Sequence, residues 1–502
     1  EEMVYNPFDQ LILVRNALQK SKGIWVYTKY DELGRPFVNG TYTDSRDRVN
    51  VLADLNASFA SNKYGDASFP TSSIFEKSRT YYDEYPTTVI TNMMGTETPL
   101  SATAPLEFSF YGAQACNTCT INLKDKVTAT VEQLEIPTGA NLSLIQKTSL
   151  LSIQYYDEYG RTIQTRSDNH MGKTEISSVK YDFAGRVLET VKTTGDQATD
   201  NYKEWNKNTY DKGQRLKMTV QQLTEKVDDL EKVSKAEPVG RYKYNEIGEM
   251  IEKWQGCKQQ VITTQTNIKG WLLNINGTAD PATLKTKKQF FGMELTYDQA
   301  DGQISQASWG TVPSFGANAQ LAGVRSYAYQ YDALKRILSA TYNNDGDATE
   351  DFSLSGMSYD INGNIKTLKR KYKTNFVDEL SYNYAIGNRL NTVTDAGNEA
   401  NVPAGKNPYF KKNNTVGDDY LYDFGGNLIQ DKNRKIAISY NYLGLPEKVV
   451  YDNSTNIYYV YDASGNKVQK QNAPMPQQGV MVNKTMNYIG NMLFMGNELQ
   501  QI

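Results

Sequence analysis

The sequence repeats one short motif along most of its length: Tyr-Asp-x-x-Gly, then Arg or Asn, then an apolar residue. Three clear copies are YDFAGRVLET at Tyr181, YDINGNIKTL at Tyr359 and YDFGGNLIQD at Tyr422. Asp or Asn suits the first position of a type I turn, and a Gly three positions later suits the left-handed conformation that closes such a turn. Each copy is therefore predicted to form the turn of one β-hairpin.

The residues on either side of the turn carry the strand signal. In RSYAYQYD, Tyr327, Tyr329 and Tyr331 alternate with Ser, Ala and Gln, which places three rings on one face of an extended strand. Aliphatic residues after the turn, such as Val187 and Ile365, are predicted to form the returning strand and to pack against the tyrosines. The pattern predicts an all-β chain, built as an array of hairpins.

Eight copies keep Tyr-Asp/Asn-x-x-Gly intact. Their predicted turn residues are Tyr30, Asp31, Gly34, Tyr156, Asp157, Gly160, Tyr181, Asp182, Gly185, Tyr244, Asn245, Gly248, Tyr359, Asp360, Gly363, Tyr422, Asp423, Gly426, Tyr440, Asn441, Gly444, Tyr461, Asp462 and Gly465. Altered copies start at Tyr5 (with Asp9 in place of Gly), Tyr82, Tyr210, Tyr297, Tyr331 and Tyr382. We expect first hairpins over residues 1–40, an irregular segment of strands and loops over 41–150, and a regular array over 151–502.

One stretch has a different period. In VQQLTEKVDDLEKVSK, Leu223, Val227, Leu230 and Val233 follow helical spacing, which predicts a helix over residues 220–235. A long hairpin is the alternative interpretation.

The composition excludes several classes of protein. The 54 basic and 57 acidic residues give a net charge of −3, so no overall field favours nucleic acid or an anionic membrane. No apolar run is long enough to span a bilayer as a helix. The sequence opens at Glu1 without Met or a signal sequence, so we expect it to be a piece of a longer exported protein.

The candidate chemical residues are few. Cys116 and Cys119 form a CNTC pair, which suits a local disulfide or two free thiols better than a zinc site, because two more ligands are missing. Cys257 stands alone. His170 has no nucleophile signature near it in sequence, so we expect a hydrogen-bonded or solvent-exposed side chain.

The clusters of acidic residues are also predicted to have no metal-binding or catalytic role. The stretch NNDGDATED, from Asn343 to Asp351, has oxygen ligands at calcium-loop spacing but lacks the bidentate Glu, so we expect a solvated turn. The pairs Asp228/Asp229 and Asp418/Asp419 are expected to be solvated charges. We predict no catalytic residue, no cofactor and no metal site.

The repeated motif resembles that of the bacterial RHS/YD-repeat (rearrangement hotspot) family over nearly the whole chain. The strings TNIKGWLLNINGT, GMSYDINGNIKTLKR and YNYAIGNRLNTVTD are also similar to secreted members. The resemblance implies a continuous spiral β-sheet that forms part of a hollow shell or cocoon around a C-terminal toxin or effector. The sequence stops at NYIGNMLFMGNELQQI, before the Asp-Pro segment that cleaves the chain in many members.

These expectations leave three classes of function. The first is a non-catalytic shell region of an extracellular or cell-surface protein used in toxin delivery and interbacterial competition, with the effector of the same parent chain as its partner. Family analogy adds an outer-membrane secretion translocon as a further partner. The second is a cell-surface carbohydrate-binding or adhesion module, in which rows of Tyr and Trp stack on a surface glycan. The third is an enzyme, but no group of residues in the sequence matches a known catalytic pattern.

Overall fold

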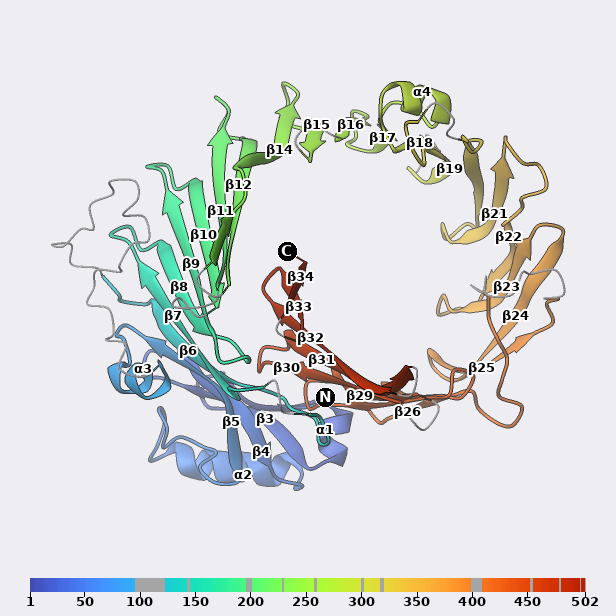
Figure 1. Cartoon of the computed structure of the whole chain (residues 1–502). Helices are drawn as coiled ribbons and strands as arrows, with labels where there is room; N and C mark the ends of the chain where they lie inside the picture. The colour runs from blue at the N-terminus through green and yellow to red at the C-terminus, as the bar shows by residue number, and fades with distance from the viewer. Residues whose placement is uncertain are drawn as a thin grey trace. The chain divides into compact units, whose positions relative to one another are not determined.

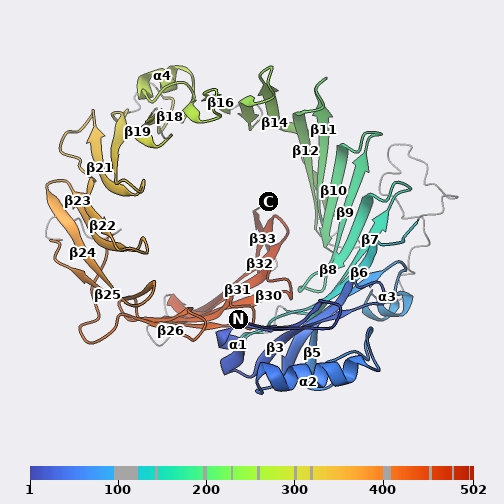
Figure 2. The same ribbon diagram turned by 180° about the vertical axis from the view of Figure 1, so that it is seen from behind.

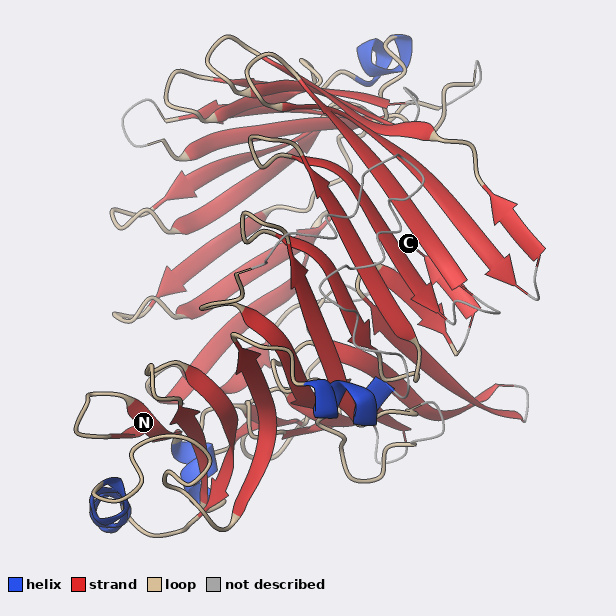
Figure 3. Cartoon of the chain, turned by 90° about the vertical axis from the view of Figure 1, so that its left-hand side faces the viewer, coloured by secondary structure: helices blue, strands red, loops and turns tan. Residues whose placement is uncertain are grey.

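The computed structural model describes residues 1–94, 122–141, 145–195, 201–227, 230–256, 260–298, 302–316, 320–398, 409–451, 455–477, 480–496 and 498–501. Within them the chain is almost entirely antiparallel β-structure with a few short helices, so the predicted all-β hairpin array is confirmed (Figure 3). Cys116, Cys119 and Cys257 lie outside the described residues.

Strands β1–β25 form one sheet among the described residues. They are β1 (Glu2–Tyr5), β2 (Leu11–Arg15), β3 (Ile24–Tyr30), β4 (Pro36–Thr43), β5 (Ile74–Tyr82), β6 (Val127–Gln133), β7 (Ser149–Tyr156), β8 (Thr162–Asp168), β9 (Thr174–Tyr181), β10 (Val187–Gly195), β11 (Asn201–Tyr210), β12 (Leu216–Val227), β13 (Leu230–Val233), β14 (Glu237–Tyr244), β15 (Met250–Gln255), β16 (Gln260–Thr266), β17 (Leu272–Ile275), β18 (Phe291–Tyr297), β19 (Ile304–Thr311), β20 (Arg325–Tyr331), β21 (Ile337–Asn344), β22 (Leu354–Tyr359), β23 (Ile365–Tyr372), β24 (Asn375–Ile386) and β25 (Arg389–Asp395).

A second sheet holds the last described strands. They are β26 (Tyr420–Tyr422), β27 (Leu428–Asp431), β28 (Ile436–Tyr440), β29 (Pro446–Tyr451), β30 (Thr455–Tyr461), β31 (Lys467–Gln477), β32 (Val480–Ile489), β33 (Met492–Met495) and β34 (Glu498–Gln501). The helices within the described residues are α1 (Ala17–Ser21), α2 (Arg48–Phe59), α3 (Thr87–Met94) and α4 (Pro281–Thr286).

Consecutive strands pair antiparallel, first across a motif turn and then across the following connection. β7 pairs with β8 across the turn at Asp157, β8 pairs with β9, and β9 pairs with β10 across the turn at Asp182. The register shifts opposite the tyrosine that ends each first strand, as at Tyr181, which pairs with Val187. Because the motif turns alternate with the other connections, successive motif turns lie at the same edge of the sheet.

The chain divides into two compact units. Unit 1 comprises residues 1–205, 223–234 and 421–502, and unit 2 comprises residues 206–222 and 235–420. In unit 1, α2 lies beside β3 and β4 (Figures 1 and 2). Val51 and Leu55 of α2 are buried in one cluster with Trp25, Tyr27 and Val38. Burying large apolar side chains between a helix and a sheet is the main stabilising term of such a layer.

The last hairpins of unit 1 pack against its first ones. Ile489, Met492 and Phe494 form a buried cluster with Met171 from the connection between β8 and β9. Glu135 and Tyr461 form an antiparallel bridge, in which the Glu135 N–H donates to the Tyr461 carbonyl at 2.7 Å. Residues more than 300 positions apart in sequence thus form one folded unit.

Unit 2 carries a run of contacting aromatic rings on its strands. On β20 the ring centroids of Tyr327 and Tyr329 are 6.1 Å apart and those of Tyr329 and Tyr331 are 6.4 Å apart. Tyr327 also packs on Trp309 of β19 at 5.7 Å and on Tyr342 of β21 at 5.2 Å. The predicted alternation is confirmed, since Ala328 and Gln330 between these rings are exposed. Cross-strand aromatic pairs of this kind contribute roughly 0.2–1 kcal/mol each.

The predicted helix over residues 220–235 is wrong. The described part of this stretch lies in β12 and β13, which pair from Thr224↔Val233 to Val227↔Leu230, so the alternative of a long hairpin is correct. Leu230 and Val233 are 72% and 54% exposed and do not pack against an apolar surface. Their helical spacing therefore does not indicate the buried face of a helix.

The helices that do form were not predicted. In α2, Asp47 accepts a hydrogen bond from the Asn50 N–H as N-cap, and Val51, Leu55 and Phe59 are buried at i, i+4 and i+8. These two signals were available in the sequence. No helix in the described residues has the length and apolar character needed to cross a membrane.

Candidate functional site

The turn at Asp182 shows how the motif works. The Asp182 N–H donates to the Arg186 carbonyl at 2.9 Å, and the Gly185 N–H donates to the Asp182 carbonyl at 3.1 Å. Asp182 Oδ1 accepts from the Arg186 N–H and Oδ2 accepts from Arg186 Nε. These backbone and side-chain hydrogen bonds from Arg186 lower the pKa of the Asp182 carboxyl.

The eight intact copies share this geometry. In each, the Gly N–H donates to the carbonyl of the Asp or Asn three residues earlier, and the Gly φ lies between 72° and 91°. These glycines are Gly34, Gly160, Gly185, Gly248, Gly363, Gly426, Gly444 and Gly465. A left-handed φ strains any residue with a side chain, which explains the glycine at this position.

Altered copies keep the left-handed residue without glycine. Asp9, Gln214 and Lys335 occupy the same place with φ of 61°, 63° and 65°. The copy read from Tyr382 is displaced, because the tyrosine that takes the structural role is Tyr384, two residues later. A shift of two residues keeps a side chain on the same face of a strand, so the alternation could not distinguish the two.

The motif tyrosine reaches back to the previous hairpin, which the sequence reasoning missed. The Tyr181 hydroxyl donates to the Thr162 carbonyl at 3.0 Å, and the Tyr359 hydroxyl donates to the Ile337 carbonyl at 2.6 Å. The same bond runs from Tyr30 to Leu11, Tyr156 to Val127, Tyr244 to Leu216, Tyr440 to Leu428 and Tyr461 to Pro446. The recurrence of Tyr rather than Phe was the available signal.

The motif arginine reaches forward to the next hairpin. Arg161 Nη1 donates to the Asp182 carbonyl at 3.0 Å, and the Arg161 guanidinium lies 4.9 Å from the Tyr181 ring centroid. Arg336 repeats this with Asp360 and lies 4.4 Å from the Tyr359 ring. We call the combination of a motif tyrosine and the arginine of the preceding hairpin the Tyr–Arg clamp. Arg35 with Tyr82, and Arg215 with Tyr244, are further instances.

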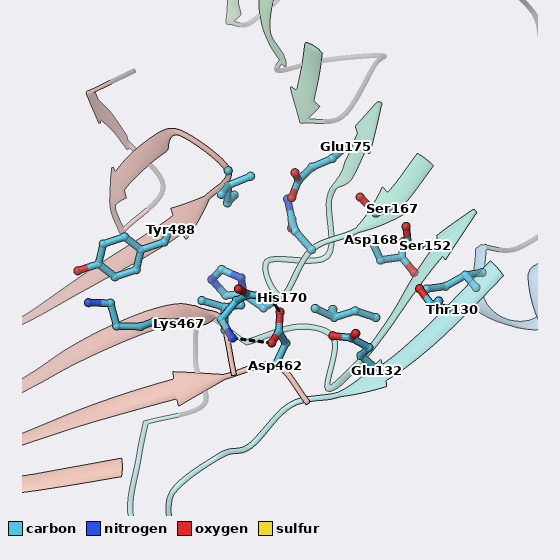
Figure 4. A pocket seen from close by; sticks show the side chains of 17 residues that line it. Thr130, Glu132, Ser152, Ser167, Asp168, His170, Glu175, Asp462, Lys467 and Tyr488 are labelled. Carbon is cyan, nitrogen blue, oxygen red and sulfur yellow. Dashed lines mark hydrogen bonds between the residues drawn. The ribbon is translucent and has the colours of Figure 1, made fainter. Parts of the chain in front are cut away.

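A polar pocket of about 500 Å³ lies in unit 1 between β6–β9 and the last hairpins (Figure 4). Its lining includes Glu132, Asp168, Glu175, Lys467 and Tyr488. Sequence reasoning did not bring these residues together, because they come from strands separated by some three hundred positions.

His170 lies in this pocket and is only 1% exposed, so the solvent-exposed alternative is wrong and the hydrogen-bonded one is correct. Its Nε2 lies 2.9 Å from Asn487 Oδ1. Because Asn487 Nδ2 donates to the Gly496 carbonyl, Oδ1 is the acceptor and His170 Nε2 carries the proton. Burial lowers the pKa of His170, which favours the neutral imidazole.

The pocket also contains carboxyl groups with altered acidity. Burial raises the pKa of Glu175 to about 7 and also raises the pKa of Glu132, whose Oε1 accepts from Ser464 Oγ at 2.6 Å. Asp168 Oδ1 pairs with Lys147 at 2.6 Å, while its buried Oδ2 has no hydrogen-bond partner. Together with His170, Glu132 ties the last hairpins of unit 1 to the first.

The turn that carries His170 could have been found from its spacing. The Asn169 N–H donates to the Lys173 carbonyl, and the Gly172 N–H donates to the Asn169 carbonyl. Asn169-x-x-Gly172 therefore has the hydrogen bonds of the motif turn, at the opposite edge of the sheet, with Asp168 in the place of Tyr. The missing tyrosine concealed it.

The other acidic candidates have structural contacts. Asp419 is fully buried, pairs with Lys412 at 2.6 Å and accepts from the Val393 N–H, so its interpretation as a solvated charge is wrong. Asp418, beside it in sequence, accepts from Asn391 Nδ2 at the surface. Asp228 and Asp229 lie outside the described residues.

The acidic side chains between Asn343 and Asp351 have partners within the protein. Asp347 Oδ1 accepts from the Thr349 N–H and hydroxyl, and the Asp351 carboxylate pairs with Lys371 at 3.0 Å. Across the described ranges no group of three or more His, Cys, Asp or Glu side chains is placed to hold a metal ion.

Comparison with known proteins gives fold-level similarity. No family model and no curated protein matches the chain. Among solved structures, a Tc holotoxin pore from Photorhabdus luminescens matches with a TM-score of 0.60 and 12% identity, covering 98% of this chain and 20% of that chain. A TcdB2–TccC3–Cdc42 structure matches with a TM-score of 0.40 and 14% identity, covering 98% and 27%.

The chain thus spans about a fifth of the length of the first of these proteins. At 12% identity the match indicates a similar fold and gives no evidence of shared chemistry. The fold of this chain is similar to that of part of a Tc holotoxin complex.

Proposed function

We propose that the chain is a non-catalytic wall region of an encapsulating shell in a protein of the RHS/YD-repeat family. The shell would enclose and protect a toxin or effector at the C-terminal end of the same parent chain. The observation that carries this proposal is the Tyr–Arg clamp. In the hairpins that have it, such as the one at Tyr181, the clamp fixes the hairpin to the one before it by a hydroxyl–carbonyl bond and a stacked guanidinium.

Such clamps suit a long, thin wall. Where no helix covers the sheet, bonds between neighbouring hairpins add to the interface that holds the array together. Antiparallel pairing of each hairpin with its neighbours also leaves few free strand edges for aggregation. The fold similarity to part of a Tc holotoxin complex supports the same role.

We further propose that the parent protein acts outside the cell that makes it, in toxin delivery to competing bacteria, and that it passes an outer-membrane translocon. Affinity purification of the parent protein from detergent-solubilised membranes tests the second point. Recovery of an outer-membrane channel is the expected result, and its absence under conditions that retain other membrane partners counts against it.

Limited proteolysis of the parent protein tests the proposed enclosure. The effector segment should resist a protease that digests it when it is expressed alone, and it should be digested faster when Tyr359→Phe and Arg336→Met open one clamp. Digestion at equal rates in the parent protein and in isolation would show that nothing is enclosed.

A further inference from the structure

A second pocket, of about 580 Å³, lies in unit 2 on β11, β12, β14 and β15. Its lining includes Tyr210, Lys217, Arg241, Tyr242, Lys243 and Trp254, and we call it the aromatic–basic pocket. A volume of this size lies within the range of small-molecule sites, which combine flat apolar walls with a few polar groups.

The basic groups of this pocket are not neutralised. Among the described residues, Lys217, Arg241 and Lys243 form no ion pair, and Arg241 Nε is buried without a hydrogen-bond partner. The carboxylate in the lining, Glu252, already accepts from Trp254 Nε1. A buried N–H without an acceptor is unfavourable, and a guanidinium is best satisfied by a carboxylate or a phosphate.

Trp254 lies beside the guanidinium of Arg241. Met218, Arg241 and Trp254 are cross-strand neighbours on β12, β14 and β15, and the Arg241 Cζ lies 5.7 Å from the Trp254 ring centroid. Lys243 lies on the same face of β14 as Arg241, whereas Tyr242 lies on the opposite face with Gly240, where a Cβ would come within 2.7 Å of the Tyr242 hydroxyl. Tryptophan offers a flat apolar surface with a polar edge, which suits the C–H face of a sugar ring.

The strands that line this pocket cannot bind an extended peptide through their backbone. β14 pairs with β12 on one side and with β15 on the other, and β15 pairs in turn with β16. No free strand edge borders the pocket at β14 or β15, so a peptide cannot add as a further strand. Recognition must come from side chains, which favours a compact ligand.

We propose that the aromatic–basic pocket binds a carboxylated sugar. The ring lies against Trp254, and the carboxylate bonds to the guanidinium of Arg241, with Lys243, on the same face of β14, adding positive charge. This site is independent of the proposed shell, because it needs only the described strands of unit 2.

Calorimetric titration of the full chain with methyl glucuronide and methyl glucoside tests the assignment, because the two probes differ only in the carboxylate. We expect the glucuronide to bind at least ten times more tightly, and its affinity to fall as salt is added. Equal affinity for both glycosides, or no binding of either, would overturn the proposal. Benzoate binding as tightly as the glucuronide would also overturn it, since the sugar would then be irrelevant.

Variants locate the site. Arg241→Met should abolish the preference for the glucuronide, and Trp254→Ala should weaken both glycosides at least tenfold. Lys366→Met, which removes one positive charge near Tyr384 outside the pocket, should change neither. If Arg241→Met fails to fold, Lys243→Met on the pocket rim provides the second measurement and should reduce the preference several-fold. An unchanged preference in both would place binding elsewhere.

Discussion

Replacing Gly363 by Val isolates the conformational requirement of the motif turn. Gly363 has a φ of 87°, and a Cβ built on it would have no heavy atom within 4 Å. The substitution therefore adds backbone strain without a steric clash. A β-branched residue in the left-handed region costs about 1–2 kcal/mol.

The matched control is Gly316→Val. Gly316 is exposed and does not have a left-handed φ, and its Cβ would meet only Ser314 Oγ at 3.8 Å. Both substitutions reduce the entropy of the unfolded chain by a similar amount, so this effect cancels in the comparison. Gly195, at the end of β10, is unsuitable as a control because its φ is 132°.

The difference should appear as a local change in hydrogen exchange. A cost of about 1–2 kcal/mol raises the opening equilibrium roughly 5- to 30-fold, and in a repeat array the effect should be confined to the substituted hairpin and its neighbours. Exchange measured by mass spectrometry should therefore speed up over β22 and β23 in Gly363→Val and remain unchanged there in Gly316→Val. Equal protection in both variants, or faster exchange throughout the chain, would refute the reasoning.

Three further outcomes follow from the contacts described above. Glu175 has its pKa raised to about 7 by burial, so its stabilising contribution is complete below its ordinary pKa of 4.5 and is lost as the pH rises through 7. Thermal melts between pH 5 and 8 should therefore decline less for Glu175→Gln than for the wild type, and parallel profiles would contradict this. Asp419→Ala should destabilise unit 2 by about 2 kcal/mol in denaturant titrations, less than a fully buried pair because Lys412 is partly exposed, whereas Asp418→Ala should have little effect. Tyr359→Phe removes the donor to the Ile337 carbonyl and should cost about 1 kcal/mol, seen as faster exchange at the junction of two hairpins; unchanged exchange there would remove the clamp as a stabilising element.

The hairpin turns could be predicted from the sequence because every requirement is local. Asp182, Gly185 and Arg186 lie within five residues, and the side-chain period of two sets the face of each strand. The clamp could not be predicted in the same way. Tyr359 bonds to a carbonyl 22 residues earlier, and the spacing between copies varies too much to identify the partner.

The polar pocket could not be predicted from the sequence at all. His170 meets Asn487 across 317 positions, and only folding of the last hairpins onto the first brings them together. The helix prediction over residues 220–235 failed for a related reason. Apolar spacing is informative only where a surface exists to cover it, and Leu230 has none.

Electron cryomicroscopy of the full parent protein tests the central claim most directly. The account predicts clamped hairpins that continue into a wall around a cavity, with density for the effector segment inside. A flat or solid array of hairpins, with the effector segment outside it, would contradict the proposed shell.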